Sequence, residues 1–535
     1  MRLESLKRFE WVLSTLLSLV VLSLLIARAT HAGALWRDEC AALQLARMPT
    51  FAEIGANFQH EAFPLLFPTT IRLYTNVFGA SDTALRCFGL AVGVLFIAAT
   101  WFNLRIVGSV PLLSLALIGL NTGFLTWGTS IRGYGLGSVL IILAFGFILK
   151  VVCKPTTKWI AAACLVCLAS VQCLVHNAAL LLAIGLSAIV VSLMRHDLRR
   201  STVIAGIGAL CMISLLPYIR PYSNGSAWNI VVQSQVTPAS LWNNLNWAFG
   251  APLSLMPTVW LILFVTLLGA SITRLYHIRG NKPAPEWDRL MFGVLVLVVS
   301  VITYYAFLQI LSYVTRTWYY LALLSTVGIA LDLLAASLSR TLLIRLGRIL
   351  FVLIALVLLP SANWPKIVER QTNIDVIAHQ LENNARPSDL IVVSFWHYGI
   401  SFNRYYHGVA PWLTLPQIND HRIHRYDLFM AKMVSPKPID DVLDAIDRTL
   451  ASGNSVWFVG GVRISRNGET TLSLSPAPDS KFGWNNKAYM ESWTAQLGAF
   501  VTMHAAEPKV VTVKADGPVN DLEDIPLMVV QGWRD

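Results

Sequence analysis

The chain has 535 residues, of which 55% are hydrophobic and 13% are charged, and its mean hydropathy is +0.58. Soluble domains typically carry about 25% charged residues, so the composition excludes an ordinary soluble protein and predicts a polytopic membrane protein. The net charge of +11 is uneven: residues 1–363 hold 25 Lys and Arg but 11 Asp and Glu, whereas residues 364–535 hold 16 and 19. This basic excess is typical of cytoplasmic loops, and residues 364–535 carry no basic stripe, so we expect no nucleic-acid partner.

Eleven apolar stretches are long enough for transmembrane helices, which need about 20 mostly apolar residues. We predict spans at 11–29, 86–104, 109–126, 134–151, 158–174, 176–194, 202–219, 256–273, 290–310, 317–336 and 343–361. Lys and Arg gather before the first span and in every second loop after it, which predicts a cytoplasmic N-terminus. Eleven spans then place residues 364–535 outside, on the face of the first long loop, 30–83.

The outer loop 30–83 holds five of the acidic residues of the membrane part, and Asp38 and Glu39 open it. Carboxylates near hydrocarbon are costly and are rarely placed there without function. Asp38 could take a proton from an acceptor hydroxyl, or the carboxylates could bind a divalent cation through oxygen. The alternative is that Asp38 and Glu39 are an ordinary pair of solvated loop carboxylates without a chemical role. Thr50-Phe-Ala-Glu53 is a capping-box pattern that predicts a helix over 51–59, and 39–47 could form another.

Further polar residues fall in other turns on the same predicted face. His60-Glu61 lies in loop 30–83 and could bind a metal or a phosphate. Arg132 and Tyr134 precede the fourth span, His176 lies between the fifth and sixth, and Arg316 and Tyr319 precede the tenth. Arginine matches phosphate oxygens with its planar fork. Snorkelling or interfacial side chains are the alternative for each position. Together they predict a pocket with a carboxylate base and phosphate-binding arginines.

Residues 364–535 alternate helical and strand patterns, which predicts a small α/β domain with a mainly parallel sheet. We expect helices at Ile367–Asn384 and Asp440–Ser452 and strands at Asp389–Phe395, Ser455–Val459, Lys509–Lys514 and Pro526–Val530. The seven cysteines all precede this part of the chain, so no disulfide framework holds it. The predicted domains are therefore a transmembrane domain, 1–363, and an extracytoplasmic α/β domain, 364–535.

The pattern resembles the GT-C superfamily of polyprenyl-phosphate-sugar-dependent glycosyltransferases. It is similar to the bacterial branch related to protein O-mannosyltransferases, lipid A aminoarabinose transferase and rhizobial-type lipid A galacturonosyltransferases. The residues that carry the resemblance are the acidic pair Asp38-Glu39, the block from His60 to Leu66, Phe78-Gly79, Arg86, Arg132-Gly-Tyr134, His176, and Arg316 with Tyr319. It covers the first six spans well and the rest loosely. Two departures are Ile131, where many members have an acidic residue, and Glu61, where the family has proline.

The resemblance implies a GT-C-like fold of about 11 transmembrane helices and transfer of a sugar from a polyprenyl-phosphate donor. Asp38, with Glu39, would act on the acceptor hydroxyl, and His60, Glu61 and His176 would contact substrate. Arg132, Tyr134, Arg316 and Tyr319 would bind the donor phosphate. Metal dependence stays open, with Asp38, His60 and Glu61 as candidate ligands.

The implied setting is a bacterial inner membrane of a cell envelope, with membrane lipids as partners. The acceptor could be lipid A or another glycolipid, a polysaccharide such as that of lipopolysaccharide, or a protein. A membrane transporter or lipid flippase is the main alternative. Such a protein needs charged residues inside the spans. Only Asp332 is a clear acidic candidate there. A non-catalytic assembly protein is a third option.

Overall fold

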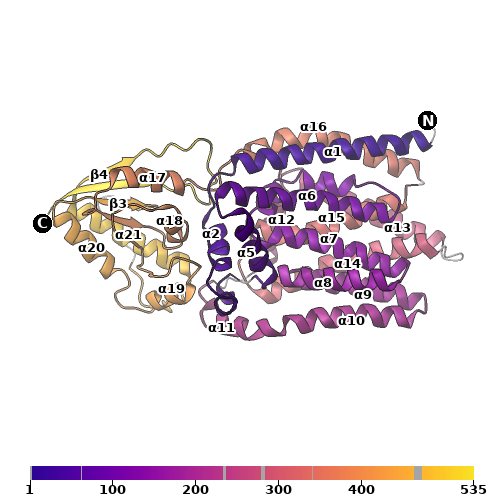
Figure 1. Cartoon of the computed structure of the whole chain (residues 1–535), viewed down its shortest axis with the longest axis horizontal. Coiled ribbons are helices and arrows are strands. Elements are labelled where there is room, and N and C mark those ends of the chain that lie inside the picture. Colours follow the sequence, from indigo (N-terminus) through magenta and orange to yellow (C-terminus); the bar gives the residue numbers. More distant parts are fainter. Residues whose placement is uncertain are drawn as a thin grey trace. The chain divides into compact units, whose positions relative to one another are not determined.

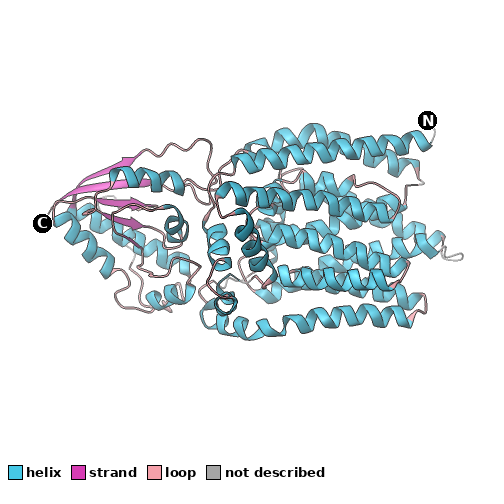
Figure 2. Ribbon diagram, viewed as in Figure 1, coloured by secondary structure: helices cyan, strands magenta, loops and turns pink. Residues whose placement is uncertain are grey.

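A computed structural model describes residues 3–61, 63–232, 236–278, 284–339, 341–462 and 473–534. The chain divides into two compact units, and neither is one continuous stretch. The first, called here the helical unit, comprises Met1–Thr30, Phe63–Ile219 and Ser234–Val368. The second, called the α/β unit, comprises His31–Ala62, Arg220–Gln233 and Glu369–Asp535. Figure 2 shows that the strands belong to the α/β unit.

The helical unit is a bundle of long apolar helices (Figure 1). Nine helices among the described residues are long and apolar enough to cross a membrane, which confirms a polytopic membrane protein. They are built on α1 (Leu3–His31), α6 (Asp82–Ile106), α7 (Gly133–Cys153), α9 (Asn177–Met194), α10 (Leu198–Leu215), α13 (Met256–His277), α14 (Ala284–Leu311), α15 (Leu321–Ser337) and α16 (Leu342–Ile367). The predicted span 158–174 is a shorter apolar helix, α8 (Thr157–Cys173). Shorter helices are α5 (Leu66–Phe78), α12 (Pro238–Ala248) and the 3₁₀ turns η3 (Leu216–Tyr218) and η4 (Thr317–Tyr320).

The predicted span 109–126 is wrong as a single helix. It contains two π-helical segments, η1 (Leu115–Gly119) and η2 (Phe124–Gly128), with a break at Asn121. The Asn121 amide nitrogen donates to the carbonyls of Ala248 at 2.9 Å and Phe249 at 2.8 Å. The Oδ1 of Asn121 accepts from the backbone N–H of Phe124 at 3.1 Å, which satisfies a donor at the start of the second segment. Hydropathy detects an apolar stretch but not a break inside it.

Asp332, the mid-span acid, holds the start of this broken segment. It is fully buried in α15, and its Oδ2 accepts hydrogen bonds from Leu112 N (2.9 Å), Ser114 N (3.1 Å) and Ser114 Oγ (2.8 Å). These are backbone donors at the start of a helical segment, which otherwise have no partner. Glu10 and Asp288, which are also buried in the helical unit, pair with Arg345 at 3.1 Å and with Arg195 at 2.7 Å. All three acids therefore have structural partners, which weakens the transporter alternative.

We expect Asp332→Leu to destabilise the helical unit by several kcal/mol, because each buried donor left without an acceptor costs about 1–3 kcal/mol. Asp332→Asn keeps one acceptor oxygen and should cost less. Thermal unfolding of the purified protein measures both. Ser325→Ala is the matched control: Ser325 is also buried in α15, and its hydroxyl has no partner among the described residues. Equal losses from Asp332→Leu and Ser325→Ala would contradict the capping role.

A five-stranded mixed sheet forms the middle of the α/β unit. The strands are β1 (Leu390–Val393), β2 (Trp412–Thr414), β3 (Val456–Val459), β4 (Ala505–Val511) and β5 (Leu527–Trp533), in the order β2-β1-β3-β5-β4. β1 is parallel to β2 and β3, whereas β5 is antiparallel to β3 and β4. The prediction of a mainly parallel sheet is thus wrong for the C-terminal half. A parallel neighbour needs a crossover, usually a helix, and the described chain between β4 and β5 has none.

Helices cover both faces of this sheet. On one face Val392, Phe458 and Val530 pack with α19 (Tyr426–Met433), α20 (Asp440–Ala451) and α21 (Asn486–His504). On the other, Ile391 and Val459 pack with α17 (Ile374–Asn384) and α18 (Tyr398–Tyr405). α17 begins later than the predicted Ile367, because residues 368–373 are not helical and the backbone N–H of Arg370 bonds to the carbonyl of Pro518 at 2.8 Å.

The outer loop contributes helices to the α/β unit as well. They are α2 (Arg37–Ala46), α3 (Phe51–Ala56) and α4 (Phe58–Glu61), and most of α11 (Ile219–Asn229) joins them. The predicted helix over 39–47 is confirmed by α2. The helix predicted over 51–59 is two short helices, and Thr50 Oγ1 accepts from Glu53 N at 3.1 Å as the capping pattern predicts.

Candidate functional site

The first turn of α2 fixes Asp38. α2 begins directly after Trp36, and Glu39 reaches back so that its Oε2 accepts from the Trp36 backbone N–H at 3.3 Å. Most of the helix is buried, including Leu43 and Leu45. Carboxylates in a first helical turn are favoured by the helix dipole. The side chain of Asp38 remains 16% exposed, whereas Glu39 is fully buried. Glu39, predicted as catalytic, therefore caps α2.

His424 lies between the two carboxylates that the sequence singled out. Its Nδ1 is 2.7 Å from Glu61 Oε1, and its Nε2 is 3.5 Å from Asp38 Oδ1. The His424 backbone N–H also donates to Glu61 Oε1 at 3.3 Å. All three side chains are largely buried. Because each ring nitrogen faces a carboxylate, the geometry favours the doubly protonated imidazolium. We call Asp38, Glu61 and His424 the acid–histidine cluster.

Burial lowers the pKa of His424, but the carboxylates of Glu61 and Asp38 outweigh burial and raise the pKa to about 9 from an ordinary 6.5. The imidazolium thus persists at neutral pH and compensates two buried negative charges. Paired buried charges are stable only when their partners are in place. The cluster therefore ties α2 and α4 to residue 424.

A second carboxylate contacts the start of α2 from the C-terminal part of the chain. Glu523 is fully buried, and its two oxygens accept from the Arg37 backbone N–H at 3.0 Å and from Ser401 Oγ at 2.8 Å. Burial raises the pKa of Glu523 to about 7, although Arg37 opposes the shift. Arg37 Nε also lies 3.5 Å from Asp38 Oδ1. Arg37 and His424 thus both fix the Asp38 carboxylate.

We expect the α/β unit to lose stability as the pH rises from about 6.5 to about 9, because folding raises the pKa values of Glu523 and His424. The lowered pKa values of His60, His397 and His421 act below this range, where they add stability as the pH rises. The penalty from Glu523 grows up to about pH 7, where its carboxyl is ionised when the chain is unfolded but only partly when it is folded, and it persists above this pH. The stability that His424 contributes is complete below 6.5 and is lost as the pH rises through about 9. Thermal unfolding across this range measures the effect. His424→Gln should flatten its upper part and Glu523→Gln its lower part, and unchanged profiles in both would contradict the assignment.

His60 contacts the cluster without joining it. Its Nδ1 lies 3.2 Å from the carbonyl oxygen of His424, so this nitrogen carries the proton. Its ring stacks on Trp228, with 5.4 Å between centroids. Burial lowers the pKa of His60, so the ring is neutral. No group of three or more His, Cys, Asp or Glu in the described parts of the chain is arranged to hold a metal ion. The candidate ligands Asp38, His60 and Glu61 are instead arranged around His424.

A surface pocket of about 310 Å³ opens beside the cluster. Arg37, His397, Tyr398, Lys487 and Glu491 supply its polar lining, and Phe395 supplies an aromatic ring. Lys487 Nζ lies 3.7 Å from Glu491 Oε1. Burial, Arg37 and His424 lower the pKa of His397 well below its ordinary value, despite Asp38. The pocket therefore presents a neutral imidazole, a Lys–Glu ion pair and the guanidinium of Arg37.

The predicted phosphate-binding residues gather in the helical unit. Arg132 caps the start of α7, and its guanidinium lies 4.6 Å from the centre of the Phe63 ring. Tyr134 is 5.6 Å from Tyr319 and 6.4 Å from His176 between ring centroids, and His176 is 5.0 Å from Tyr319. These rings form an aromatic group around the N-terminal ends of α7, α9 and α15.

Two of the predicted site residues, His176 and Arg316, differ from the others in their surroundings. Both ring nitrogens of His176 are buried without a hydrogen-bond partner among the described residues, although such groups normally find one. Arg316 caps η4, and its side chain is exposed, with no ion pair to a residue in the described ranges. The structure thus brings Arg132, Tyr134, His176 and Tyr319 together but leaves Arg316 as a surface cation.

His424, Glu523 and His397 were missed by sequence analysis. The signal for His424 is the run Asp420-His-Arg-Ile-His-Arg-Tyr-Asp427, which places two histidines among four charged residues. Glu523 and His397 have no comparable signal, because their environment is created by burial against α2.

Comparisons with known proteins give limited information. No protein-family model and no curated protein matches the sequence. The crystal structure of ArnT from Cupriavidus metallidurans bound to undecaprenyl phosphate matches with a TM-score of 0.49 and 11% identity, covering 97% of this chain and 98% of that chain. The apo structure of the same protein matches with a TM-score of 0.46 and 12% identity, covering 84% and 92%. TM-scores below 0.5 at such identities do not establish a common fold, and no functional conclusion follows from them.

Proposed function

We propose that this protein is an integral-membrane glycosyltransferase that moves a sugar from a polyprenyl-phosphate donor to an extracytoplasmic acceptor. The acid–histidine cluster is the observation that carries the proposal: a carboxylate directly after the first membrane span is held in place by two cations. The family resemblance around Asp38, Arg132 and Arg316 supports the donor class. The acceptor is a glycolipid such as lipid A, a polysaccharide or a protein.

In the proposed reaction the acceptor hydroxyl oxygen attacks the anomeric carbon of the sugar. The bond between that carbon and the phosphate oxygen breaks, and the polyprenyl phosphate leaves with the bonding electrons. Asp38 accepts the proton of the hydroxyl as the new bond forms, so the sugar is transferred with inversion. Arg37 and His424 orient the carboxylate, and they stabilise it as an anion until the acceptor arrives. Glu39 fixes the first turn of α2 and acts indirectly.

Stabilising the leaving phosphate is the second task of such an enzyme, because negative charge grows on it in the transition state. Arg132 and Arg316 supply positive charge, and the hydroxyls of Tyr134 and Tyr319 supply donors. His176, with its two uncommitted ring nitrogens, is a further donor for a substrate oxygen.

The setting that we propose is a bacterial inner membrane, with the N-terminus in the cytoplasm and residues 364–535 outside. The distribution of Lys and Arg along the sequence supports this orientation. An assembly protein without enzymatic activity is disfavoured by the cost of burying Asp38, Glu61 and Glu523.

The test is release of free polyprenyl phosphate from a panel of radiolabelled polyprenyl-phosphate sugars. The purified full-length protein is incubated with each donor and with an envelope extract as acceptor source. Release that depends on one sugar and requires Asp38 would support the proposal and identify the donor. Protein that is folded by thermal unfolding, yet releases no phosphate from any donor, would contradict the proposed donor class.

We expect Arg132→Ala to weaken donor use by at least about tenfold, since charge-assisted bonds to phosphate contribute about 1.5–3 kcal/mol. Arg316→Ala should act in the same direction with little effect on folding, because its side chain is exposed. Initial rates at varied donor concentration measure both. Arg72→Ala is the comparison variant, because Arg72 lies on α5 outside the predicted site. An unchanged rate for both Arg132→Ala and Arg316→Ala would remove the phosphate-binding role.

A further inference from the structure

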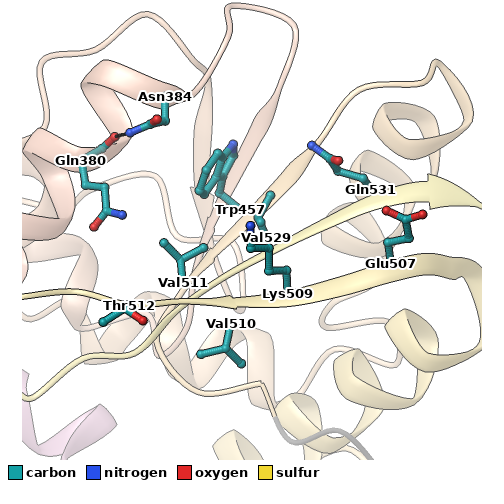
Figure 3. Close-up of a pocket in the computed structure, with 10 residues that line it drawn as sticks. All are labelled: Gln380, Asn384, Trp457, Glu507, Lys509, Val510, Val511, Thr512, Val529 and Gln531. Atoms are coloured by element: carbon teal, nitrogen blue, oxygen red, sulfur yellow. Dashed lines mark hydrogen bonds between the residues drawn. The ribbon is translucent and has the colours of Figure 1, made fainter.

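Part of one sheet face in the α/β unit is left open. A pocket of about 490 Å³ lies there, between α17 and the strands β3, β5 and β4. Its chemistry is set by Gln380, Asn384, Trp457, Glu507, Lys509 and Gln531. Figure 3 shows the indole of Trp457 amid the lining, with Gln380 and Asn384 to one side and Gln531 and Glu507 to the other.

Strand register explains why these side chains share one face. Trp457 pairs with Val529, and Val529 pairs with Lys509, so the three lie in a row across β3, β5 and β4. Glu507 pairs with Gln531 in the next row. Residues directly opposite each other in a sheet point to the same side. The pocket floor is therefore built by regular pairing.

Trp457 is a fixed aromatic surface. Its indole N–H donates to Asp389 Oδ2 at 3.4 Å, and the residue is half-buried against the apolar core of this face. The hydrogen bond and the packing hold the ring in one orientation. A fixed aromatic ring offers a negative π face to polarised C–H groups, and the C–H faces of a sugar ring are of this kind.

The rim of the pocket consists of polar groups with unused hydrogen-bonding capacity. The side chains of Gln380, Glu507 and Lys509 make no hydrogen bond or ion pair with any residue that the structure describes. Asn384 donates to the Gln380 carbonyl at 2.6 Å and Gln531 donates to Ser455 Oγ at 2.9 Å, so each keeps its amide oxygen as an acceptor. The rim therefore offers both hydrogen-bond donors and acceptors. This matches a ligand with hydroxyl groups, because a hydroxyl both donates and accepts.

Charge and backbone argue against other ligands. One Lys and one Glu line the pocket, so no net charge attracts a phosphate, an anionic lipid or a nucleic acid. β4 is the outer strand of the sheet and would be the place for an added peptide strand, but Pro508 interrupts its donors. We propose that this pocket binds a neutral carbohydrate chain, one sugar stacking on Trp457 and its hydroxyls bonding to the carboxamide and carboxylate rim. The proposal does not depend on the proposed transfer reaction.

The test is direct binding of neutral oligosaccharides to the full-length protein in lipid nanodiscs, because sugar-based detergents would compete. Maltohexaose, cellohexaose, mannohexaose and chitohexaose are the probes, and saturation-transfer NMR and calorimetry are the measurements. We expect at least one probe to bind with a Kd of about 1 mM or tighter. Trp457→Ala should weaken this binding at least about tenfold, while Trp457→Phe retains most of it.

Trp457→Ala also removes the bond to Asp389 and could unfold the sheet, so two exposed positions provide a second route. Gln380→Ala and Glu507→Ala should each weaken binding several-fold without changing the unfolding temperature. Met503→Ala, at an exposed position of α21 outside the pocket, is the matched control. Binding that persists in the Trp457, Gln380 and Glu507 variants, binding of polygalacturonate in place of the neutral probes, or no binding at all would overturn the proposal. Asp38→Asn should bind the probes normally, which separates this site from the failure of sugar transfer.

Discussion

Replacing Asp38 with asparagine should reduce sugar transfer by about 10²- to 10⁴-fold, the range that general acid–base catalysis contributes. The amide cannot accept the proton of the acceptor hydroxyl, yet it occupies the same space and keeps one oxygen toward Arg37 and His424. The unfolding temperature should therefore change little. The measurement is the initial rate of polyprenyl phosphate release under saturating donor, compared at equal amounts of folded protein.

Glu53→Gln is the matched control for this prediction. Glu53 belongs to the same outer loop, but its contact is with Thr50 at the start of α3, at 3.3 Å, and not with the acid–histidine cluster. A glutamine at this position preserves the cap, so the rate should stay near that of the unmodified protein. Full activity in Asp38→Asn would show that Asp38 takes no part in the chemistry. An equal loss of activity in Glu53→Gln would show that both losses come from a disturbed loop structure.

Replacing His424 with leucine should destabilise the α/β unit by about 3–5 kcal/mol, the usual cost of leaving buried charge without its partner. Glu61 is only 1% exposed at its side chain and accepts hydrogen bonds from the ring and from the backbone N–H of His424. The ring is lost in the variant while the backbone bond remains, so Glu61 must either take up a proton or draw in water. Thermal unfolding followed by tryptophan fluorescence measures the loss.

His421→Leu separates this effect from general disturbance of the segment. His421 lies three residues earlier and packs on Trp412, with 4.4 Å between ring centroids, and no carboxylate of the described residues lies at hydrogen-bonding distance from it. Its replacement should cost much less. A second variant, His424→Leu with Glu61→Leu, should recover much of the stability, because no buried charge is then left unpaired. No recovery in the double variant would show that the coupling between the two residues is weak.

The parts of the fold that follow from local pattern were predictable. Apolar length located the long helices, and the capping pattern located the start of α3. The break at Asn121 was not predictable, because the stabilising partners, Ala248, Phe249 and Asp332, come from distant segments. The mixed sheet was missed for a related reason. β2 is only three residues long, and strand direction depends on connections that hydropathy does not reveal.

The residues of the candidate site that precede residue 364 were predictable from the sequence, whereas those after it were not. Asp38 and Glu61 stood out because acids are rare before residue 364, but an acid in residues 364–535 does not stand out by composition. Glu523 was hidden for this reason, and His424 because histidine spacing alone does not reveal a partner. Glu39 was a candidate because it lies beside Asp38, and the structure adds a capping contact with the backbone of Trp36 that the sequence does not reveal.

The bond between Glu61 and His424 joins residues 363 positions apart, which has a consequence for biosynthesis. Ribosomes add about 5–20 residues per second, so tens of seconds pass between synthesis of the outer loop and synthesis of its partner. During that interval the carboxylates of Asp38 and Glu61 lack the imidazolium of His424. The acid–histidine cluster is completed only when residue 424 has been synthesised and the α/β unit has folded, so a chain terminated before this residue never acquires the cluster.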